Sequence, residues 1–194
     1  MKKLIFIAIV SLLFAAQAQA ADSIDTDKDG LIDAQETQFK TDINNPDSDG
    51  DGYVDGLEIR TAFDPLSASP KRLTKSILID TKKQELYQQL NGITIRTHTV
   101  STGKASMPSP KGTFKIANKA VRAWSKMYGL WMPYWMGISG TRAGIHELPE
   151  WPNGYKEGAN HLGTPVSHGC IRLGEVAAKI VYDWTDIGTK VTIK

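Results

Sequence analysis

The stretch Ser167-His168-Gly169-Cys170-Ile171-Arg172-Leu173 contains the only cysteine of the 194-residue chain. A single cysteine cannot form a disulfide within its own chain, so it requires another role. The neighbouring His168 and Arg172 favour a thiolate, which is the nucleophilic form of the side chain. Gly169 leaves the backbone in front of the thiol open. The stretch therefore predicts a cysteine nucleophile rather than a small apolar residue of the core.

Ser167 to Leu173 resembles the active-site signature of the L,D-transpeptidase family of bacterial cell-wall enzymes, whose catalytic domain is called YkuD-like. Further similarity runs from about Ser76 to the last residue. It includes Pro108-Ser109-Pro110-Lys111-Gly112-Thr113-Phe114, which resembles the Thr-Pro-x-Gly-x-Phe segment of the family with Ser109 in place of threonine. The resemblance implies a mainly β fold, an L,D-transpeptidase-like β-sandwich or barrel with one late helix. It also implies that peptidoglycan stem peptides are the substrates.

The resemblance implies a histidine upstream of the cysteine as the catalytic base, and Gly144-Ile145-His146 is similar to that part of the family. Cys170 would be the nucleophile and His146 the base, with the backbone carbonyl of Glu147 orienting the imidazole. His146 lies 24 positions before Cys170, which is longer than is usual in the family. The additional residues, 150–161, predict a surface loop or lid. His161 lies within this loop and is the alternative base.

Further site residues follow from the same stretch. The N–H groups around His168, Gly169 and the cysteine are expected to form the oxyanion hole, and His168 to shape the site and contact substrate. Arg172 keeps its charge at all relevant pH values and is suited to bind a substrate carboxylate. Ser167 is expected to support the loop through its hydroxyl. Glu147 stands where the family has a small residue and is expected to contact substrate.

The first residues predict export from the cytoplasm. Two lysines, an apolar run over 4–16 and Ala18-Gln19-Ala20 together are typical of a secretory signal peptide over residues 1–20. The apolar run is too short to cross a bilayer, and no second long apolar run follows, so no membrane span is expected. The protein is expected in the periplasm.

Charge divides the remaining chain into two modules. Residues 21–70 carry a net charge of −10, whereas residues 71–194 carry +10. Such a division predicts two domains with different roles. We expect a calcium-binding repeat module over 21–65, a linker over 66–72 and the catalytic domain over 73–194. The basic domain lacks an aromatic-basic motif, so an anionic cell-wall polymer is a better partner than nucleic acid.

Two segments of the acidic module match one calcium-loop pattern, D-x-D-x-D-G-x-x-D-x-x-E. Carboxylates at positions 1, 3 and 5, the carbonyl at position 7 and the side chains at positions 9 and 12 are suited to a hard cation. The pattern resembles thrombospondin type-3 and EF-hand loops, and it predicts a structural Ca²⁺ in each, with no metal needed for catalysis. The expected ligands are Asp25, Asp27, Asp29, Leu31, Asp33 and Glu36 in the first loop, and Asp47, Asp49, Asp51, Tyr53, Asp55 and Glu58 in the second.

Periodicity outlines the catalytic domain. Alternating apolar residues predict a meander of strands at 76–80, 85–90 and 93–100, in which Asn91-Gly92 is a hairpin turn. A one-sided apolar pattern predicts a helix over 175–184, followed by a strand over 190–193. The segment 124–151 is rich in aromatic residues, and its Pro133 and Gly137 argue against one regular strand there. Some of its rings are expected to line a cleft.

The family resemblance implies a peptidoglycan L,D-transpeptidase that forms a cysteine thioester on stem tetrapeptides. It would cross-link diaminopimelate residues or attach a protein acceptor to the wall. One alternative keeps the same nucleophile and transfers the acyl group to water, as an L,D-carboxypeptidase or a hydrolase of wall-protein links. A second alternative is a non-catalytic, calcium-dependent wall-binding protein.

Overall fold

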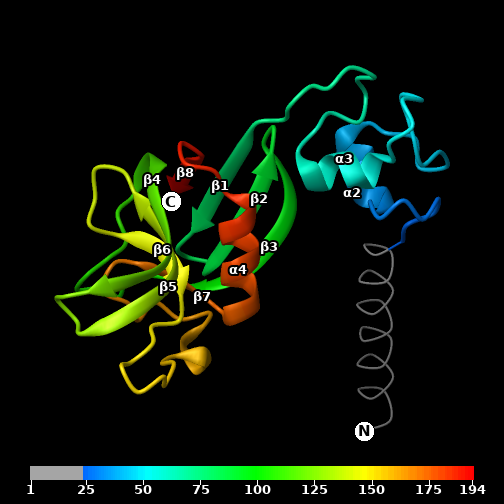
Figure 1. The fold of residues 1–194 in the computed structure, drawn as a ribbon. Helices are drawn as coiled ribbons and strands as arrows, with labels where there is room; N and C mark the ends of the chain where they lie inside the picture. The colour runs from blue at the N-terminus through cyan, green and yellow to red at the C-terminus, as the bar shows by residue number, and fades with distance from the viewer. Residues whose placement is uncertain (1–23) are drawn as a thin grey trace, which may run out of the picture. The chain divides into compact units, whose positions relative to one another are not determined.

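The computed structural model describes residues 24–194, so the predicted signal peptide over 1–20 lies outside the described residues. The chain divides into two units, one that extends to Leu73 and one formed by Thr74–Lys194 (Figure 1). Within the described range, no helix has the length and apolar character needed to cross a membrane.

The N-terminal unit consists of two loop-helix repeats. Helix α2 (Asp33–Phe39) and helix α3 (Asp55–Thr61) each follow one acidic loop. Each helix ends at a residue in the left-handed conformation, Lys40 with φ 69° and Ala62 with φ 62°. The apolar core of the unit is small, and its buried members are Leu31, Phe39, Ile59, Ala62 and Leu73. So small a core supplies little hydrophobic stabilisation.

The segment predicted as a linker, 66–72, folds back on the N-terminal unit. The Asp64 N–H donates to the Lys71 carbonyl at 2.9 Å, and the Leu73 N–H donates to the Ala62 carbonyl at the same distance. The Arg72 guanidinium lies 4.2 Å from the centre of the Phe63 ring. These contacts close the unit as an irregular hairpin after α3.

The C-terminal unit is an eight-stranded closed barrel with the strand order β1-β2-β3-β7-β6-β5-β4-β8. Its strands are β1 (Lys75–Asp80), β2 (Glu85–Leu90), β3 (Ile93–Ser101), β4 (Gly112–Ser125), β5 (Leu130–Ile138), β6 (Gly144–Glu147), β7 (Ile171–Leu173) and β8 (Lys190–Ile193). The predicted meander 76–100 corresponds to β1, β2 and β3 with small differences at the ends. In β2 every second residue is buried, as expected for a strand with one face on the core.

Two parallel pairs close the barrel, β1 with β8 and β6 with β7, and the other neighbouring strands pair antiparallel. The β6–β7 pair places His146 directly opposite Arg172. The barrel core is aliphatic, and its largest fully buried side chains are Ile77, Ile79, Leu86, Leu90, Ile116, Met136, Ile145, Ile171, Leu173 and Ile193. Each such burial contributes about 1.5–3 kcal/mol relative to exposure.

The aromatic segment 124–151 does not form one regular strand, as expected, because it contains the end of β4, the whole of β5 and β6, and the turns between them. Strand β5 itself passes through Pro133 and Gly137. The strand accommodates this sequence because it is irregular at Tyr134, which has φ 51°, and because β4 shifts its register between Ile116 and Asn118. The predicted late helix is α4 (Glu175–Trp184), which buries Ala178, Val181 and Trp184.

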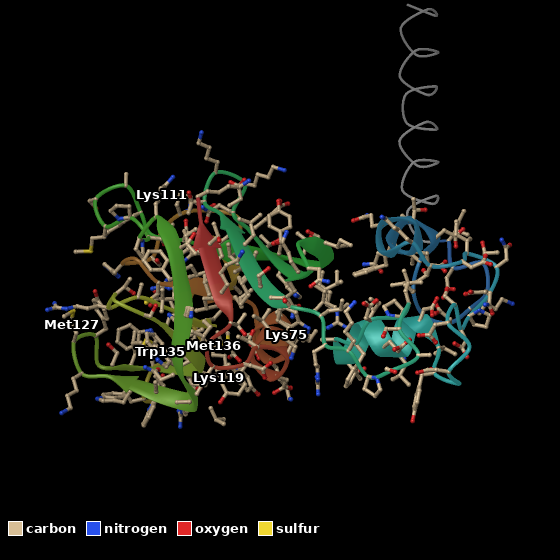
Figure 2. All side chains as sticks on the ribbon, turned by 90° about the horizontal axis from the view of Figure 1, so that it is seen from above. Lys75, Lys111, Lys119, Met127, Trp135 and Met136 are labelled. Atoms are coloured by element: carbon tan, nitrogen blue, oxygen red, sulfur yellow. The ribbon has the colours of Figure 1, made fainter. Side chains whose placement is uncertain are left out.

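Two lysines bind the C-terminal end of α4. Lys119 Nζ donates to the carbonyl oxygens of Tyr182 at 2.6 Å and Thr185 at 2.5 Å, and Lys75 Nζ donates to that of Trp184 at 2.8 Å (Figure 2). Cations at this end oppose the negative pole of the helix. The described chain has three α-helices and is otherwise mainly β, which confirms the predicted fold class.

Candidate active site

Cys170 lies at the end of the loop that precedes β7, and two serine hydroxyls hold this loop. Ser167 Oγ donates to the Cys170 carbonyl at 2.5 Å and accepts the Gly169 N–H at 3.1 Å, contacts of the kind expected from a hydroxyl that supports the loop. Ser109 Oγ donates to the Gly169 carbonyl at 2.9 Å and accepts the Gly103 N–H at 2.9 Å. Gly169 has φ 109°, a conformation that strains residues with a Cβ. The backbone before the thiol is thus fixed on both sides.

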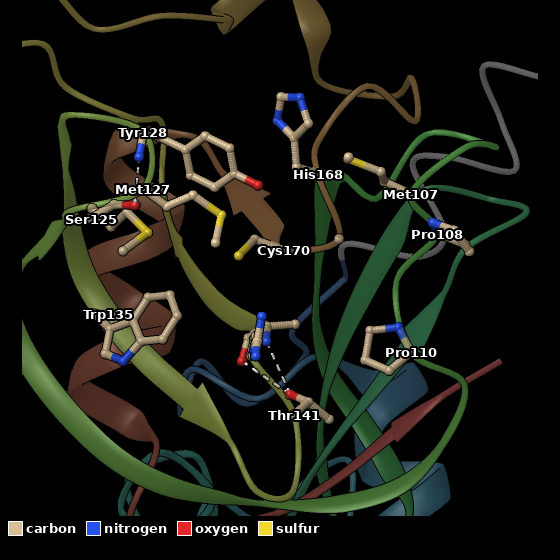
Figure 3. A pocket seen from close by; sticks show the side chains of 14 residues that line it. Met107, Pro108, Pro110, Ser125, Met127, Tyr128, Trp135, Thr141, His168 and Cys170 are labelled. Atoms are coloured by element: carbon tan, nitrogen blue, oxygen red, sulfur yellow. Dashed lines mark hydrogen bonds between the residues drawn. The ribbon is translucent and has the colours of Figure 1, made fainter.

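Two cavities open onto Cys170. The larger has a volume of about 500 Å³ and the smaller about 180 Å³. Tyr128, Met132, His168 and Cys170 line both, so these side chains form the boundary. Figure 3 shows the large cavity, where Met127, Tyr128 and Trp135 lie on one side of Cys170 and Met107, Pro108 and Pro110 lie on the other. The small cavity is lined in addition by Leu130, His146, Pro149, Trp151, Glu157, Ser167 and Arg172.

His146 is placed on β6, is 3% exposed and lines the small cavity together with Cys170. Its Nδ1 lies 2.5 Å from the carbonyl oxygen of Glu147, as the family resemblance implied. This contact identifies Nδ1–H as the donor and leaves Nε2 as the basic nitrogen. The Trp135 ring stacks on the imidazole at a centroid distance of 5.9 Å. The hydrogen bond to the Glu147 carbonyl therefore determines the tautomer of the imidazole, and the Trp135 ring holds its position.

Burial keeps both members of the Cys170–His146 pair uncharged. It lowers the pKa of His146 to about 4, against which the hydrogen bond to the Glu147 carbonyl acts, while the charge of Arg172 adds to the lowering. Burial raises the pKa of the Cys170 thiol, opposed by a hydrogen bond from the Gly144 backbone and by Arg172. The sequence had predicted a thiolate favoured by charged neighbours. The structure corrects this, because desolvation outweighs those neighbours.

Gly144 combines two roles beside the thiol. Its backbone makes the hydrogen bond to Cys170, and a Cβ at this position would lie 2.4 Å from the Trp135 ring. Only glycine permits this approach of the indole to β6. The indole is held from its other edge, where Trp135 Nε1 donates to Asn118 Oδ1 at 2.9 Å.

Arg172 and His168 occupy opposite environments. Arg172 is 9% exposed, lines the small cavity, and its Nε is buried with no hydrogen-bond partner among the described residues. His168 is exposed, stacks on Tyr128 at a centroid distance of 5.0 Å, and has its Nε2 3.4 Å from Lys104 Nζ. Partial burial, together with the charges of Lys104 and Arg172, lowers the pKa of His168. It is therefore suited to contact ligand as a neutral ring.

Two predicted residues do not reach the cavities. Glu147 is 2% exposed, and its carboxylate lies 2.6 Å from Lys156 Nζ, so its side chain is turned away from the position expected for substrate contact. His161 ends a short 3-10 helix, η1 (Ala159–His161), and lines neither cavity. The structure therefore brings His146, and not His161, to the cavity that Cys170 lines.

Tyr128 and Trp135, which line the large cavity, belong to the aromatic segment that was expected to line a cleft. Sequence reasoning missed other residues that the barrel brings to the cysteine, among them Met132 of β5. Glu157 was also missed. It comes from the predicted lid, and the length of that segment was its only feature in the sequence that indicated a role. Ser109, which stands in place of the threonine of the family, keeps a hydroxyl at this position, and that hydroxyl holds the loop of the nucleophile.

The two acidic loops form clusters suited to a cation. Ligand atoms of Asp25, Asp27 and Asp29 lie within 4.8 Å of one another, as do those of Asp47, Asp49 and Asp51. Within the described residues, five carboxylate oxygens of the loops are buried without a hydrogen-bond partner. They belong to Asp25, Asp27 and Glu36 in the first loop, and to Asp49 and Glu58 in the second. Buried unpaired carboxylates are costly unless a cation compensates them, so these side chains fit Ca²⁺.

Not every predicted ligand has a free carboxylate. Both oxygens of Asp33 accept hydrogen bonds from Thr26, and both oxygens of Asp55 accept them from Ser48. The position 9 carboxylates, Asp33 and Asp55, therefore form hydrogen bonds that stabilise their own loops. Asp29 Oδ2 accepts the Gly56 N–H at 2.6 Å, which ties the first loop to α3.

The carboxylates at position 12, those of Glu36 and Glu58, lie close to the aspartates of their own loops. Burial, together with repulsion from the loop aspartates, raises the pKa of Glu36 and of Glu58 to about 7. The side chain of Leu31 is in the core, whereas Tyr53 at the equivalent position is exposed. The two loops thus differ in how position 7 is packed.

Known proteins resemble the C-terminal unit. YciB of Bacillus subtilis, whose name places it among L,D-transpeptidases, is 33% identical over 124 residues, which are 59% of this chain and 63% of YciB. A crystal structure of an L,D-transpeptidase from Stackebrandtia nassauensis is similar with a TM-score of 0.53 and 28% identity, over 62% of this chain and 55% of that one. L,D-transpeptidase 3 from Mycobacterium tuberculosis, solved with a faropenem-derived adduct, shares the fold with a TM-score of 0.52 and 20% identity, over 64% of this chain and 62% of that one.

The chain thus spans less than two thirds of each of these relatives. Residues 74–193, most of the chain and nearly the whole barrel unit, match the model of the L,D-transpeptidase catalytic domain, YkuD. The chain therefore belongs to the YkuD family of L,D-transpeptidase domains.

Proposed function

We propose that this protein is a peptidoglycan L,D-transpeptidase in which Cys170 is the nucleophile and His146 the base. The observation that carries the proposal is the pairing of these two residues at the small cavity, with the imidazole oriented by the Glu147 carbonyl. A nucleophile, a base and a group that orients the base are the elements of covalent acyl transfer. The family acts on peptidoglycan stem peptides, which supplies the substrate class.

In the proposed reaction the Cys170 thiol attacks the carbonyl that joins the L-centre of diaminopimelate to the terminal D-alanine. His146 takes the thiol proton and gives it to the amine of the leaving D-alanine, and a thioester remains on Cys170. An amine from a neighbouring stem, or from a protein lysine, then attacks the thioester, and His146 again takes the proton. Burial lowers the pKa of His146 and raises that of the Cys170 thiol, and this supports a proton transfer that accompanies the attack.

The oxyanion of each tetrahedral intermediate requires backbone donors near the thiol. The Gly169 N–H donates to Ser167 Oγ, which leaves the N–H groups of His168 and Cys170 as the candidate donors. Gly169 has a left-handed backbone conformation, and this conformation sets the relative orientation of the His168 and Cys170 N–H groups. The removal of one such donor typically lowers kcat by about 10²–10³.

The test is mass spectrometry of a disaccharide-tetrapeptide incubated with the mature protein. A cross-linked dimer with loss of D-alanine would support transfer to an amine, whereas tripeptide alone would indicate a carboxypeptidase. Cys170→Ala should abolish turnover and keep the fold; wild-type activity in this variant would refute the assignment. The faropenem adduct of the Mycobacterium tuberculosis relative suggests a penem or carbapenem as a second probe. A folded protein whose Cys170 resists acylation would favour the non-catalytic, wall-binding alternative.

We also propose that each acidic loop binds one structural Ca²⁺. The carboxylates of Asp25, Asp27 and Glu36 would hold the first ion and those of Asp49 and Glu58 contribute to the second, because their buried oxygens lack other partners. The ion would neutralise repulsion and order the loop, with no part in the acyl transfer. Calorimetric titration of the mature protein should give two bound Ca²⁺, and the absence of binding at millimolar Ca²⁺ would refute this.

The proposed site of action is the periplasm. The predicted signal peptide over 1–20 supports export, and cell fractionation with an antibody against the C-terminal unit tests it. Recovery of the protein with uncleaved N-terminus in the cytoplasm would refute the proposal.

A further inference from the structure

The small cavity presents one cation and one anion to any molecule that enters it. Arg172 is 9% exposed, and its Nε is buried without a partner among the described residues. Glu157 Oε1 lies 4.0 Å from Arg172 Nη1, which is too far for a hydrogen bond. Glu157 is also the one acidic side chain among the described residues that lines either cavity. The guanidinium and the carboxylate are therefore close to each other without a hydrogen bond between them.

The position of Glu157 is fixed by the segment that carries it. Trp151 Nε1 donates to Glu157 Oε2 at 3.0 Å, and the Glu157 N–H donates to the Pro149 carbonyl at 2.9 Å. The preceding Lys156 lies 2.6 Å from the buried Glu147 carboxylate and 2.9 Å from that of Glu175. The carboxylate of Glu157 is therefore held at the cavity before any ligand enters.

The chemistry of acyl transfer indicates that the small cavity holds the leaving amine and then the acceptor amine. An incoming amine attacks the thioester at the position that the leaving amine vacated, because both pass through equivalent tetrahedral intermediates. His146, which handles the proton of both amines, lines the small cavity and not the large one. A volume of about 180 Å³ accommodates an amino-acid head group, whereas the cavity of about 500 Å³ suits the longer acyl donor.

We propose that the small cavity selects an acceptor whose ammonium and carboxylate share one carbon, the head group of an α-amino acid. Arg172 would bind the carboxylate and Glu157 the ammonium. This inference rests on the proposed acyl transfer by Cys170. It makes Glu157 a specificity-determining residue that favours amines over water, since water gains nothing from either charge. The donor amide nitrogen is uncharged, so the attraction by Glu157 acts on the acceptor.

The transfer step balances without a further reactant. The bound ammonium loses one proton to water, and the neutral amine attacks the thioester carbonyl. The carbon–nitrogen bond forms, the carbon–sulfur bond breaks, and the sulfur leaves with the bonding electron pair. His146 takes the second proton from the new amide nitrogen and passes it to the sulfur, which restores the thiol.

The experiment measures how the thioester partitions between acceptors in the full mature protein. Disaccharide-tetrapeptide is the donor, and the acceptors are glycine with both charges, methylamine with the ammonium alone, and hydroxylamine, which is uncharged at neutral pH. Glu157→Gln keeps the size and the hydrogen bond from Trp151. Glu150→Gln is the matched control, because Glu150 belongs to the same segment, pairs with Arg122 and lines neither cavity.

We expect glycine to have the lowest KM in the wild type. Glu157→Gln should raise the KM of glycine and of methylamine by roughly five- to tenfold and increase the share of hydrolysed tripeptide. The partition of hydroxylamine should stay within about twofold, because no ammonium is lost. Glu150→Gln should match the wild type with all three acceptors.

Two outcomes would overturn the inference while leaving the proposed function intact. One is an unchanged KM of both ammonium acceptors in Glu157→Gln. The other is an equal loss with hydroxylamine, which would indicate a general distortion of the site. Mass spectrometry of Cys170 acylation by the donor distinguishes these two outcomes from a failure of the proposed function itself. A wild-type protein that is not acylated would overturn the proposed function and this inference together.

Discussion

At the scale of single residues, the hydroxyl of Ser109 shows how a small group can control a nucleophile it does not touch. Ser109→Ala should remove the hydrogen bond to the buried Gly169 carbonyl and leave the partly buried Gly103 N–H unpaired. We expect kcat to fall by roughly tenfold or more with little change in the KM of the donor, since an unpaired buried group costs about 1–3 kcal/mol. Steady-state kinetics on the tetrapeptide provides the check.

Ser109→Thr is the control for this prediction, because threonine keeps the hydroxyl. It should retain most of the activity, and circular dichroism should show that both variants are folded. Equal losses in the two variants would mean that the pocket around Ser109, and not its hydroxyl, sets the rate.

The raised pKa of Cys170 has a consequence that can be measured without substrate. A thiol whose pKa lies above its usual value of 9.0 holds less thiolate at any lower pH than a free thiol does. Alkylation of Cys170 by iodoacetamide, which follows the thiolate, should therefore keep rising with pH up to at least 9. Intact-mass spectrometry gives the rate at each pH. A rate that levels off near neutral pH would reveal a thiolate stabilised by its neighbours.

At the scale of elements, the two acidic loops are joined where α3 meets the first loop. A Cβ at Gly56 would lie 2.5 Å from the Asp29 carbonyl oxygen and 2.9 Å from backbone atoms of Gly30 and Leu31. Gly56→Ala should therefore separate α3 from the loop and break the hydrogen bond from Gly56 to Asp29. We expect the Ca²⁺ affinity of the first loop to fall at least tenfold, measured by calorimetry.

Gly50→Ala provides a comparison within the same unit. A Cβ at Gly50 meets no atom within 4 Å, so only its φ of 77° is unfavourable. A smaller effect on the first loop is expected from it. If Gly56→Ala bound both ions like the wild type, the close contact between the repeats would not matter for binding.

Helix α4 depends on charges that come from outside the helix. Lys119 is partly buried, and burial lowers its pKa, yet its Nζ contacts two carbonyl oxygens at the end of the helix and the Tyr182 ring. Lys119→Met keeps the aliphatic stem and loses the donor, so we expect the unfolding free energy of the barrel to fall by about 1–3 kcal/mol. Denaturant unfolding measures this. Lys179→Met, in which an exposed lysine loses only its pairing with Asp183, should leave the unfolding free energy close to that of the wild type.

Sequence patterns predicted the helices and strands better than they predicted the environment of the Cys170 thiol. The alternation in residues 76–100 and the one-sided pattern in 175–184 are local, so both elements could be predicted within small differences at their ends. The state of Cys170 depends on how much of the barrel covers it, and no nearby residue reports that. Glu147 was misplaced for the same reason, because its partner Lys156 approaches only when the 150–161 segment folds over.

At the scale of the whole molecule, the chain divides into units that carry opposite charge. Both cavities at Cys170 are lined by residues of the barrel unit. We therefore expect a fragment of residues 74–194 to be folded and to cross-link the tetrapeptide at a rate within about twofold of the mature protein, with or without Ca²⁺. A folded fragment without activity would show that the acidic unit takes part in catalysis.

The closure of the barrel also determines when the protein can fold. Strand β8 fills the gap between β1 and β4, so the strand made first in this unit pairs with the strand made last. Contacts this distant in sequence slow the search for the native state. During synthesis the other seven strands would expose two unpaired edges until residues 190–193 leave the ribosome. We therefore expect the growing chain to stay open until then, and this would suit the proposed export, because a narrow translocation channel admits only an unfolded chain.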